Sequence, residues 1–387
     1  MNIEAVIGAN YGDEGKGLFT DYLCSNRDMP LVVMTNGGSQ RGHTVETKDG
    51  KRHVFHHFSS GTFRNAPTYF PKQFLLNPMQ FVKEYDELRE YVKSPCAYRD
   101  PNCVIQLPGD IALNWHIEKS RGELKHGSVG CGIWETKYRM YNNSYITLDA
   151  FCDLSYDKQI DYIKTHAKKY RDIRCAEERI TNKAEIFDLF ISNGFIDHFI
   201  SDCMRMKELC LACPIEKIEN LDARTIVFEC GQGLKLDQFY GAGNEANTTP
   251  SFTGAIGIAR ILNDMVLNPD NVVLNYVSRT YLTKHGAGDF IELNGFENEF
   301  EFEDTTNVDN EWQDGLRFAE LDYEALLKRC NHDAEMFKTI YSKKTTVRTN
   351  IVITHVNEVP VEREFLDKIS FISNTKFADD IYFNKQK

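Results

Sequence analysis

The chain has 387 residues, of which 42% are hydrophobic and 26% are charged, and its formal net charge at pH 7 is −12. This balance is typical of a globular protein with a sizeable core. The negative charge disfavours nucleic acid and anionic membranes as partners, and no apolar run approaches the roughly 20 residues that span a bilayer.

Short β-branched runs alternate with longer helical stretches along the chain. This alternation predicts an α/β fold with a mostly parallel central sheet and helices on both faces. No repeat, low-complexity tract or linker divides the sequence, so we expect one domain over residues 1–387. The expected strands are 3–7, 31–34, 104–107, 226–228, 272–276, 350–354 and 369–372, and the expected helices are 78–91, 157–169, 184–191 and 321–329.

The eleven cysteines and the paired histidines are read as structural. Cys210 and Cys213 have C-x₂-C spacing, but a second pair is missing, and the residues before Cys210 predict a packed helix instead of a zinc site. His56 and His57 lie in the strand-like run 54–58 without a third ligand. The odd number of cysteines and the lack of a signal peptide predict free thiols in the cytoplasm.

A glycine-rich loop with a lysine near its end follows the first expected strand. Residues 8–17 read GANYGDEGKG. Such a loop leaves backbone N–H groups free to face a phosphate, with the positive end of a following helix behind them. Asn10 and Gly17 depart from the standard P-loop pattern, and the acidic pair Asp13 and Glu14 lies inside the loop. A carboxylate there is costly unless it binds a metal or handles a proton, so the loop predicts phosphoryl chemistry.

Further motifs follow this loop in a fixed order. Residues 37–44 read GGSQRGHT, residues 127–133 read GSVGCGI, residues 229–233 read ECGQG and residues 249–251 read TPS. In this order they resemble adenylosuccinate synthetases, whose motifs are G-x-x-W-G-D-E-G-K-G, G-G-x-N-A-G-H-T, G-T-T-x-R-G-I and E-G-A-Q-G. The resemblance implies a ligase that uses Mg²⁺. Such a ligase joins L-aspartate to C6 of a purine nucleoside monophosphate through a 6-phosphoryl intermediate.

The resemblance also implies roles for individual residues. Asp13 would take the N1 proton of the purine and contact Mg²⁺, together with the backbone carbonyl of Gly42. His43 would act as an acid toward the transferring phosphoryl group, Lys16 would neutralise phosphate charge, and Gln232 would contact the base or the 6-phosphoryl group. Ser128 and Thr249 would hold the 5′-phosphate of the acceptor. The other substrate-binding candidates are Asn10, Gln40 and Val129. The candidates for binding the nucleoside triphosphate are Gly12, Glu14, Gly15, Gly17, Thr44, His355 and Asn357.

One departure from the family concerns the phosphate donor. The family reads the guanine of GTP with a T-K-x-D motif, and this chain has Thr354-His355-Val356-Asn357 at the corresponding place. Asn357 cannot offer two anionic acceptors, and hydrogen bonds to charged groups are worth about 1.5–3 kcal/mol against about 1 kcal/mol for neutral ones. The substitution therefore predicts ATP or dATP as the donor.

A second departure concerns the family's arginine motif, T-T-G-R-R-R-R, which by resemblance binds the aspartate carboxylate and touches the acceptor's ribose. Residues 305–317 replace it and retain Arg317 as their one arginine. We expect Arg317 to keep the carboxylate contact, with neutral hydrogen bonds from Thr305 and Thr306. Loss of the ribose contact is harmless for an acceptor without a 2′-hydroxyl. Cys131 likewise replaces the arginine of G-T-T-x-R-G-I.

Together these departures resemble the bacteriophage PurZ-type branch of the family. Its enzymes join aspartate to dGMP and make N6-succino-2-amino-2′-deoxyadenylate for 2-aminoadenine DNA, so we expect dGMP as the acceptor and the host cytoplasm as the location. Three alternatives stay open: an adenylosuccinate synthetase that uses IMP and GTP, a nucleotide kinase or hydrolase, and a non-catalytic nucleotide-binding protein.

Quaternary structure is predicted by analogy. Family members are homodimers in which one subunit lends an arginine to its neighbour's phosphate site, and a homodimer is expected here too. Arg139 lies near the corresponding region, but Asn142, Asn143 and Ser144 fill the stretch where that arginine is expected.

Overall fold

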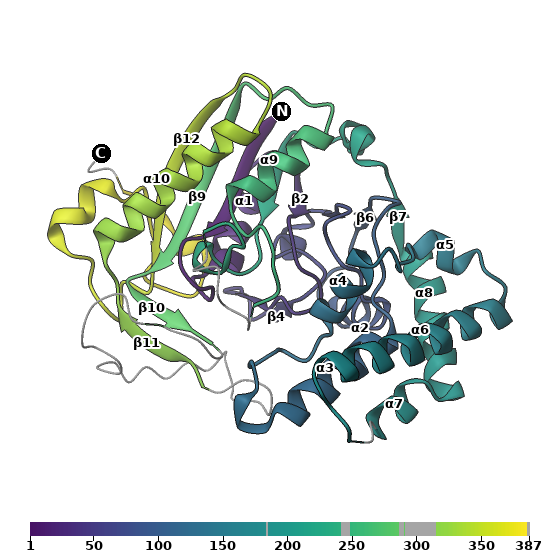
Figure 1. The fold of residues 1–387 in the computed structure, drawn as a ribbon. Coiled ribbons are helices and arrows are strands. Elements are labelled where there is room, and N and C mark those ends of the chain that lie inside the picture. The colour runs from purple at the N-terminus through teal and green to yellow at the C-terminus, as the bar shows by residue number, and fades with distance from the viewer. Residues whose placement is uncertain (183–184, 241–247, 286–289, 291–314, 385–387) are drawn as a thin grey trace.

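A ten-stranded sheet forms the centre of the protein in the computed structural model, which describes residues 1–182, 185–240, 248–285, 290 and 315–384 (Figure 1). The strand order is β14-β13-β12-β9-β1-β8-β2-β5-β6-β7, and every neighbouring pair is parallel except β13 and β14. The strands are β1 (Asn2–Gly8), β2 (Pro30–Met34), β5 (Thr68–Phe70), β6 (Ala97–Arg99), β7 (Cys210–Ala212), β8 (Thr225–Glu229), β9 (Asn271–Arg279), β12 (Thr346–Thr354), β13 (Phe371–Ile372) and β14 (Tyr382–Phe383).

Two antiparallel strand pairs, ten α-helices and six short 3₁₀ helices complete the described part of the chain. The strand pairs are β3 (His43–Glu46) with β4 (Arg52–Phe55), and β10 (Tyr281–Lys284) with β11 (Arg317–Glu320). The α-helices are α1 (Lys16–Asn26), α2 (Pro78–Leu88), α3 (Pro108–Arg121), α4 (Ile133–Tyr141), α5 (Leu148–Cys152), α6 (Tyr156–Glu177), α7 (Glu185–Phe190), α8 (Asn193–Leu209), α9 (Ala255–Asp264) and α10 (Tyr323–Ile340).

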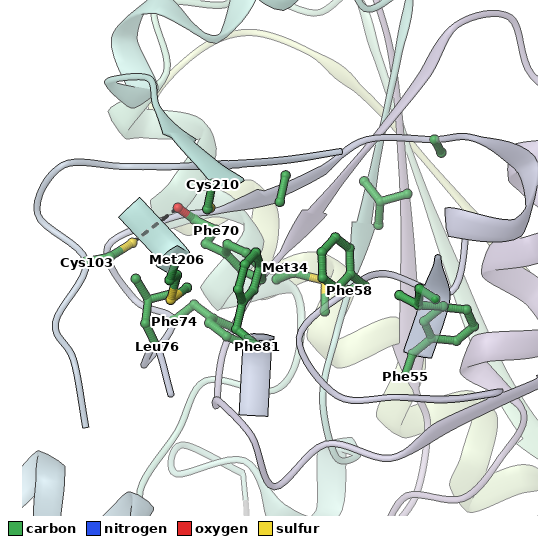
Figure 2. Close-up of a cluster of buried hydrophobic side chains, with 14 of the residues drawn as sticks. Met34, Phe55, Phe58, Phe70, Phe74, Leu76, Phe81, Cys103, Met206 and Cys210 are labelled. Carbon is green, nitrogen blue, oxygen red and sulfur yellow. Dashed lines mark hydrogen bonds between the residues drawn. The ribbon is translucent and has the colours of Figure 1, made fainter. Parts of the chain in front are cut away.

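Side chains alternate between the two faces of the sheet and fill two hydrophobic cores. In β1, Val6 packs into a core with α1, α2 and α8, whereas Ala5 and Ile7 pack into a second core with α9 and α10. Figure 2 shows the aromatic part of the first core, in which the rings of Phe58 and Phe81 stack with their centroids 5.0 Å apart. The predicted α/β fold with a mostly parallel sheet and helices on both faces is confirmed, whereas one domain over 1–387 stays a prediction.

The carboxyl ends of the central strands meet at one edge of the sheet. β1, β8 and β2 are neighbours, and the loops after them hold residues 9–15, 230–233 and 35–42. Ligands bind to open parallel sheets at this edge, where loops from adjacent strands come together. The sheet order therefore brings together motifs that lie far apart in the sequence.

The predicted strand 104–107 is wrong. Val104 and Ile105 form only isolated bridges to Thr147 and Leu76, and α3 begins directly afterwards at Pro108. An apolar run of four residues is too short for its periodicity to distinguish a strand from a buried connecting segment.

The strand-like run 54–58 is also shorter than expected. β4 ends at Phe55, because the buried carboxylate of Glu84 accepts the backbone N–H groups of His56 and His57 at 2.9 and 2.6 Å. The predicted packed helix before Cys210 is α8, in which Cys203 and Met206 are fully buried. All eleven cysteines are free thiols. In the described part of the chain, the helices are too short or too polar to span a membrane.

Candidate functional site

A cleft of about 1540 Å³ opens at the carboxyl edge of the sheet. It is lined by the loop after β1, by the segment that leads into β3, by residues before and within α4, and by the loops after β8 and β12. Most of the predicted site residues lie together here: Gly12, Asp13, Glu14, Gly15, Lys16, Gly17, Gln40, Gly42, His43, Thr44, Ser128, Val129, Gln232, Thr249, His355 and Asn357.

Two predicted site residues do not line this cleft. Asn10 is 1% exposed, and its side chain donates to Ser278 Oγ at 2.9 Å and accepts from Arg329 Nη2 at 2.5 Å, so it anchors the loop to β9 and α10. Arg317 lies on β11, with its guanidinium 5.3 Å from the centre of the Phe290 ring. Thr305 and Thr306 lie outside the described residues.

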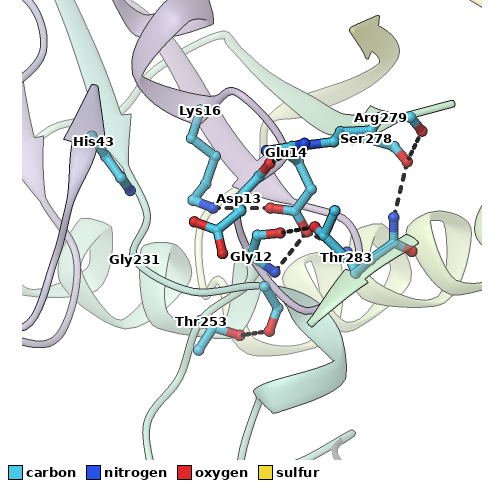
Figure 3. Close-up of polar contacts among 12 residues, drawn as sticks. Gly12, Asp13, Glu14, Lys16, His43, Gly231, Thr253, Ser278, Arg279 and Thr283 are labelled. Carbon is cyan, nitrogen blue, oxygen red and sulfur yellow. Dashed lines mark hydrogen bonds and ion pairs between the residues drawn. The ribbon is translucent and has the colours of Figure 1, made fainter. Parts of the chain in front are cut away.

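The glycine-rich loop is shaped by its own carboxylate (Figure 3). Glu14 Oε1 accepts the N–H groups of Asn10 and Gly12 at 2.8 and 2.9 Å, and Glu14 Oε2 pairs with Lys16 Nζ at 2.9 Å. Glu14 and Lys16 are both nearly fully buried. Removal of one partner from such a pair costs about 3–5 kcal/mol, so Glu14 holds the loop and the lysine in place.

Asp13 directs its carboxylate into the cleft. Its backbone is left-handed, with φ 58°, and Arg279 Nε donates to its carbonyl oxygen at 2.6 Å. Its carboxylate lies close to His285, whose Nε2 is 3.4 Å from Asp13 Oδ2. The carboxylate of Asp13 and the carbonyl of Gly42 both line the cleft, and such hard oxygen ligands fit Mg²⁺, which binds few protein groups and keeps several waters.

His43 forms a buried pair with Glu229 at the end of β8. The distance from His43 Nδ1 to Glu229 Oε1 is 2.6 Å, and Ser60 donates its hydroxyl and its N–H to the same carboxylate at 2.5 and 3.1 Å. Burial alone would raise the pKa of Glu229, but the hydrogen bond from His43 and the nearby charge of Arg41 bring it to about 2. An ionised carboxylate only accepts, so Nδ1 carries the proton and Nε2 is left for a ligand.

The protonation of His43 differs from the simplest expectation for an acid. Burial, reinforced by Arg41, lowers the pKa of His43 to about 4, so its imidazole is neutral at pH 7. Arg41 Nη1 donates to the backbone carbonyl of Glu229 at 3.1 Å, and Arg41 Nη2 lies 3.4 Å from His43 Nδ1. A proton for donation at Nε2 would have to arrive together with a negatively charged ligand.

Sequence reasoning assigned no role to Glu229 or Arg41. Both lie in motifs that were identified, and Arg41 stands where the family motif has alanine. Two signals were available. Glu229 is a charged residue at the end of a buried strand, and Arg41 is a charged residue at an alanine position near the predicted catalytic histidine.

Two glutamines present unused acceptors within the site. The side-chain carbonyl oxygens of Gln40 and Gln232 are buried and accept no hydrogen bond among the described residues. Gln232 is also left-handed, with φ 62°. Buried polar atoms are nearly always paired, so these two oxygens are suited to accept hydrogen bonds from a ligand.

The loop after β12 packs directly on the glycine-rich loop. Thr354 Oγ1 donates to the carbonyl oxygen of Glu14 at 2.9 Å. His355 has φ 62°, and its ring meets Tyr281 edge-on with the centroids 5.9 Å apart. His355 and Asn357 therefore lie beside the predicted phosphate loop, where a nucleotide base can be read.

Comparison with known proteins gives a consistent family. A sequence model described as adenylosuccinate synthetase matches residues 5–353. The adenylosuccinate synthetase of Thermoplasma volcanium is 28% identical over 297 residues, which cover 75% of this chain and 63% of that protein. The adenylosuccinate synthetase of Lactobacillus acidophilus is 28% identical over 296 residues, which cover 75% of this chain and 65% of that protein. The chain thus spans less than two thirds of the length of these curated relatives.

Two solved structures share the fold. Fully ligated adenylosuccinate synthetase from Plasmodium falciparum aligns with a TM-score of 0.63 at 19% identity, covering 92% of this chain and 77% of that one. Cyanophage S-2L succinoaminodeoxyadenylate synthetase (PurZ), bound to dGMP and dATP, aligns with a TM-score of 0.62 at 14% identity, covering 99% of this chain and 95% of that one.

Proposed function

The chain belongs to the adenylosuccinate synthetase family, and we propose that it joins the amino group of L-aspartate to C6 of a purine nucleoside monophosphate. The observation that carries this proposal is the cleft, which brings Asp13, Lys16, His43 and Gln232 together from three separate loops. A phosphate loop alone would serve a kinase equally well. The added base and the unused amide oxygen of Gln232 favour chemistry on a purine ring.

The reaction proceeds in two steps. Asp13 removes the proton from N1 of the purine, and O6 attacks the γ-phosphorus of the nucleoside triphosphate. The γ-phosphoryl group is transferred to O6, and the nucleoside diphosphate is the leaving group. The amino nitrogen of aspartate then attacks C6, loses a proton, and the 6-phosphoryl group departs as inorganic phosphate. The oxo group of a purine is a poor leaving group, so the first step makes the second one feasible.

The protein groups stabilise the charge that moves in these steps. Lys16 is fixed by Glu14 and presents a cation to the phosphates, while the N-terminus of α1 provides backbone N–H groups. His43, oriented through Glu229, faces the transferring phosphoryl group with Nε2 and donates a hydrogen bond to it once a proton has arrived there with the anionic substrates. Bound Mg²⁺, held by Asp13 and the carbonyl of Gly42, would neutralise negative charge on the phosphates.

We assign dGMP as the acceptor and ATP or dATP as the donor. Asn357 and His355 replace the family's guanine-reading acid and lysine, which favours adenine over guanine in the donor. The cyanophage protein of closely similar length and fold was solved with dGMP and dATP. The product would be N6-succino-2-amino-2′-deoxyadenylate, and a cytoplasmic homodimer is expected from family membership.

The test is phosphate release by the purified protein with Mg²⁺ and L-aspartate, with dGMP, GMP, IMP and dIMP each combined with ATP, dATP and GTP. Turnover that requires aspartate and is fastest with dGMP and an adenine triphosphate supports the proposal. Turnover with IMP and GTP would contradict the assigned acceptor and donor but not the ligase. Release that is independent of aspartate would indicate a kinase or hydrolase.

A further inference from the structure

We call the end of the cleft that Ser128 and Thr249 line the acceptor end, because the family resemblance places the acceptor's 5′-phosphate there. Arg139, on α4, does not line the cleft. Arg139 is 1% exposed, and its guanidinium donates to both carboxylate oxygens of Asp110 at 2.7 and 2.6 Å. Its other hydrogen bonds go to the carbonyl oxygens of Ile105 and Ser144. Arg139 is therefore a structural residue of its own chain.

Two other arginines do line the cleft, but their charge is already neutralised. Arg121 pairs with Glu118 and Glu178 at 2.5 and 2.9 Å. Arg174 pairs with Glu135, Glu177 and Glu178 at 2.7–3.0 Å. Four carboxylates thus surround two arginines, so the network contributes no net positive charge to the cleft.

Lys137 lies on the opposite side of α4 from Arg139. Two residues along a helix are separated by about 200°, so the helix that buries Arg139 turns Lys137 toward the cleft. Its Nζ donates to the carbonyl oxygen of Pro250, which directly follows Thr249. Ser128, Thr249 and Lys137 all line this end of the cleft.

Among the described residues, the carbonyl oxygen of Pro250 is the one hydrogen-bond partner of the Lys137 ammonium group. No carboxylate in the described part of the chain pairs with it, and burial lowers the pKa of Lys137 to about 8, so the group remains mainly protonated at pH 7. A partly buried cation that pairs with no acid among the described residues is suited to a multiply charged anion such as a phosphate monoester.

We propose that Lys137 binds the 5′-phosphate of the acceptor nucleotide. The identity of the acceptor rests on the proposed function. The placement of the cation next to Thr249 rests on its hydrogen bond to Pro250, and Ser128 lines the same cleft.

The test is calorimetric titration of the protein with dGMP and with deoxyguanosine, which lacks the phosphate. Lys137→Met should weaken dGMP binding roughly 10- to 100-fold, as expected for loss of one charge-assisted hydrogen bond, while deoxyguanosine binding stays unchanged. Lys137→Arg should retain binding within about threefold, because it keeps the positive charge. Lys158→Met removes an exposed lysine on α6 and is the matched control.

Binding separates this proposal from the proposed function, since it needs neither aspartate nor turnover. If the protein binds dGMP through Lys137 but releases no phosphate, the ligase is contradicted and the phosphate contact stands. Unchanged dGMP affinity in Lys137→Met, or an equal loss for deoxyguanosine, would overturn the contact. The proposal would also be overturned if the wild-type protein bound none of the four nucleotides dGMP, IMP, GMP and dIMP.

Discussion

The two ends of the cleft are built in different ways. At the donor end, the charges are held in short buried pairs, Glu14 with Lys16 and His43 with Glu229. At the acceptor end, arginines and acids on α3, α4 and α6 neutralise one another, and Lys137 remains with a carbonyl partner. The donor end thus has little freedom to change, whereas the cation at the acceptor end can come from a different element of the fold.

The largest expected effect comes from the base at the donor end. Asp13→Asn should lower kcat roughly 100- to 10,000-fold, because the amide cannot accept the N1 proton. Asparagine tolerates the left-handed backbone found at this position, so the loop should keep its shape. Phosphate release at saturating substrates measures the effect, and wild-type turnover in this variant would contradict the assigned base. Unchanged thermal unfolding is the control for folding.

A smaller loss tests whether the His43–Glu229 pair acts as a unit. Glu229→Gln should lower kcat roughly 10- to 100-fold with little change in the KM for the acceptor, because glutamine holds the imidazole without the negative charge. His43→Ala should abolish most of the turnover, and adding Glu229→Gln to it should then cost little more. Independent, additive losses would show that Glu229 does not act through His43.

The donor end was largely predictable because its residues are contiguous. A strand, a glycine-rich loop and the start of a helix lie within residues 2–26, and their pattern carries its own physical reason. The pairing of His43 with Glu229 was not predictable, since the two are 186 residues apart and meet only because β8 lies between β1 and β2. No local pattern encodes a strand order.

The acceptor end was less predictable for a different reason. Lys137 lies in no motif that the sequence analysis identified, and only the rotation of α4 separates its role from that of Arg139. The wrong strand at 104–107 lies just before α3, so the elements that support this end were also the least certain. Charges on helix faces acquire a function only through their neighbours in space.

Donor choice tests how strictly the donor end is fixed. Asn357→Asp restores an anionic acceptor for guanine and should raise the ratio of kcat/KM for GTP to that for ATP roughly tenfold, the difference between a charged and a neutral hydrogen bond. Initial rates with each triphosphate at saturating dGMP and aspartate measure this ratio. A ratio that stays the same would show that Asn357 does not read the base, and a wild-type KM for GTP below that for ATP would contradict the predicted donor.

The smallest effect on turnover, and a distinct effect on stability, is expected from a carboxylate behind the donor end. On α10, Arg329 Nε donates to the carbonyl oxygen of Ala9 at 2.7 Å, and one turn later Asp333 accepts the first N–H of α9, from Ala255, at 3.0 Å. Burial raises the pKa of Asp333 to about 7. Between pH 4 and 7 the folded state therefore keeps a proton that the unfolded state loses, so this group destabilises the fold as the pH rises through that window.

Asp333→Asn removes this titration while keeping a side-chain oxygen for Ala255. The free energy of unfolding of the wild type should fall relative to that of the variant by up to about 4 kcal/mol from pH 4 to pH 7, since each pKa unit corresponds to about 1.4 kcal/mol. Urea unfolding of both proteins across this range measures the difference. Parallel pH profiles would mean that Asp333 stays ionised against α9. Because Asp333 does not line the cleft, turnover of the variant should stay within about twofold of the wild type, which would separate the support of the donor end from its chemistry.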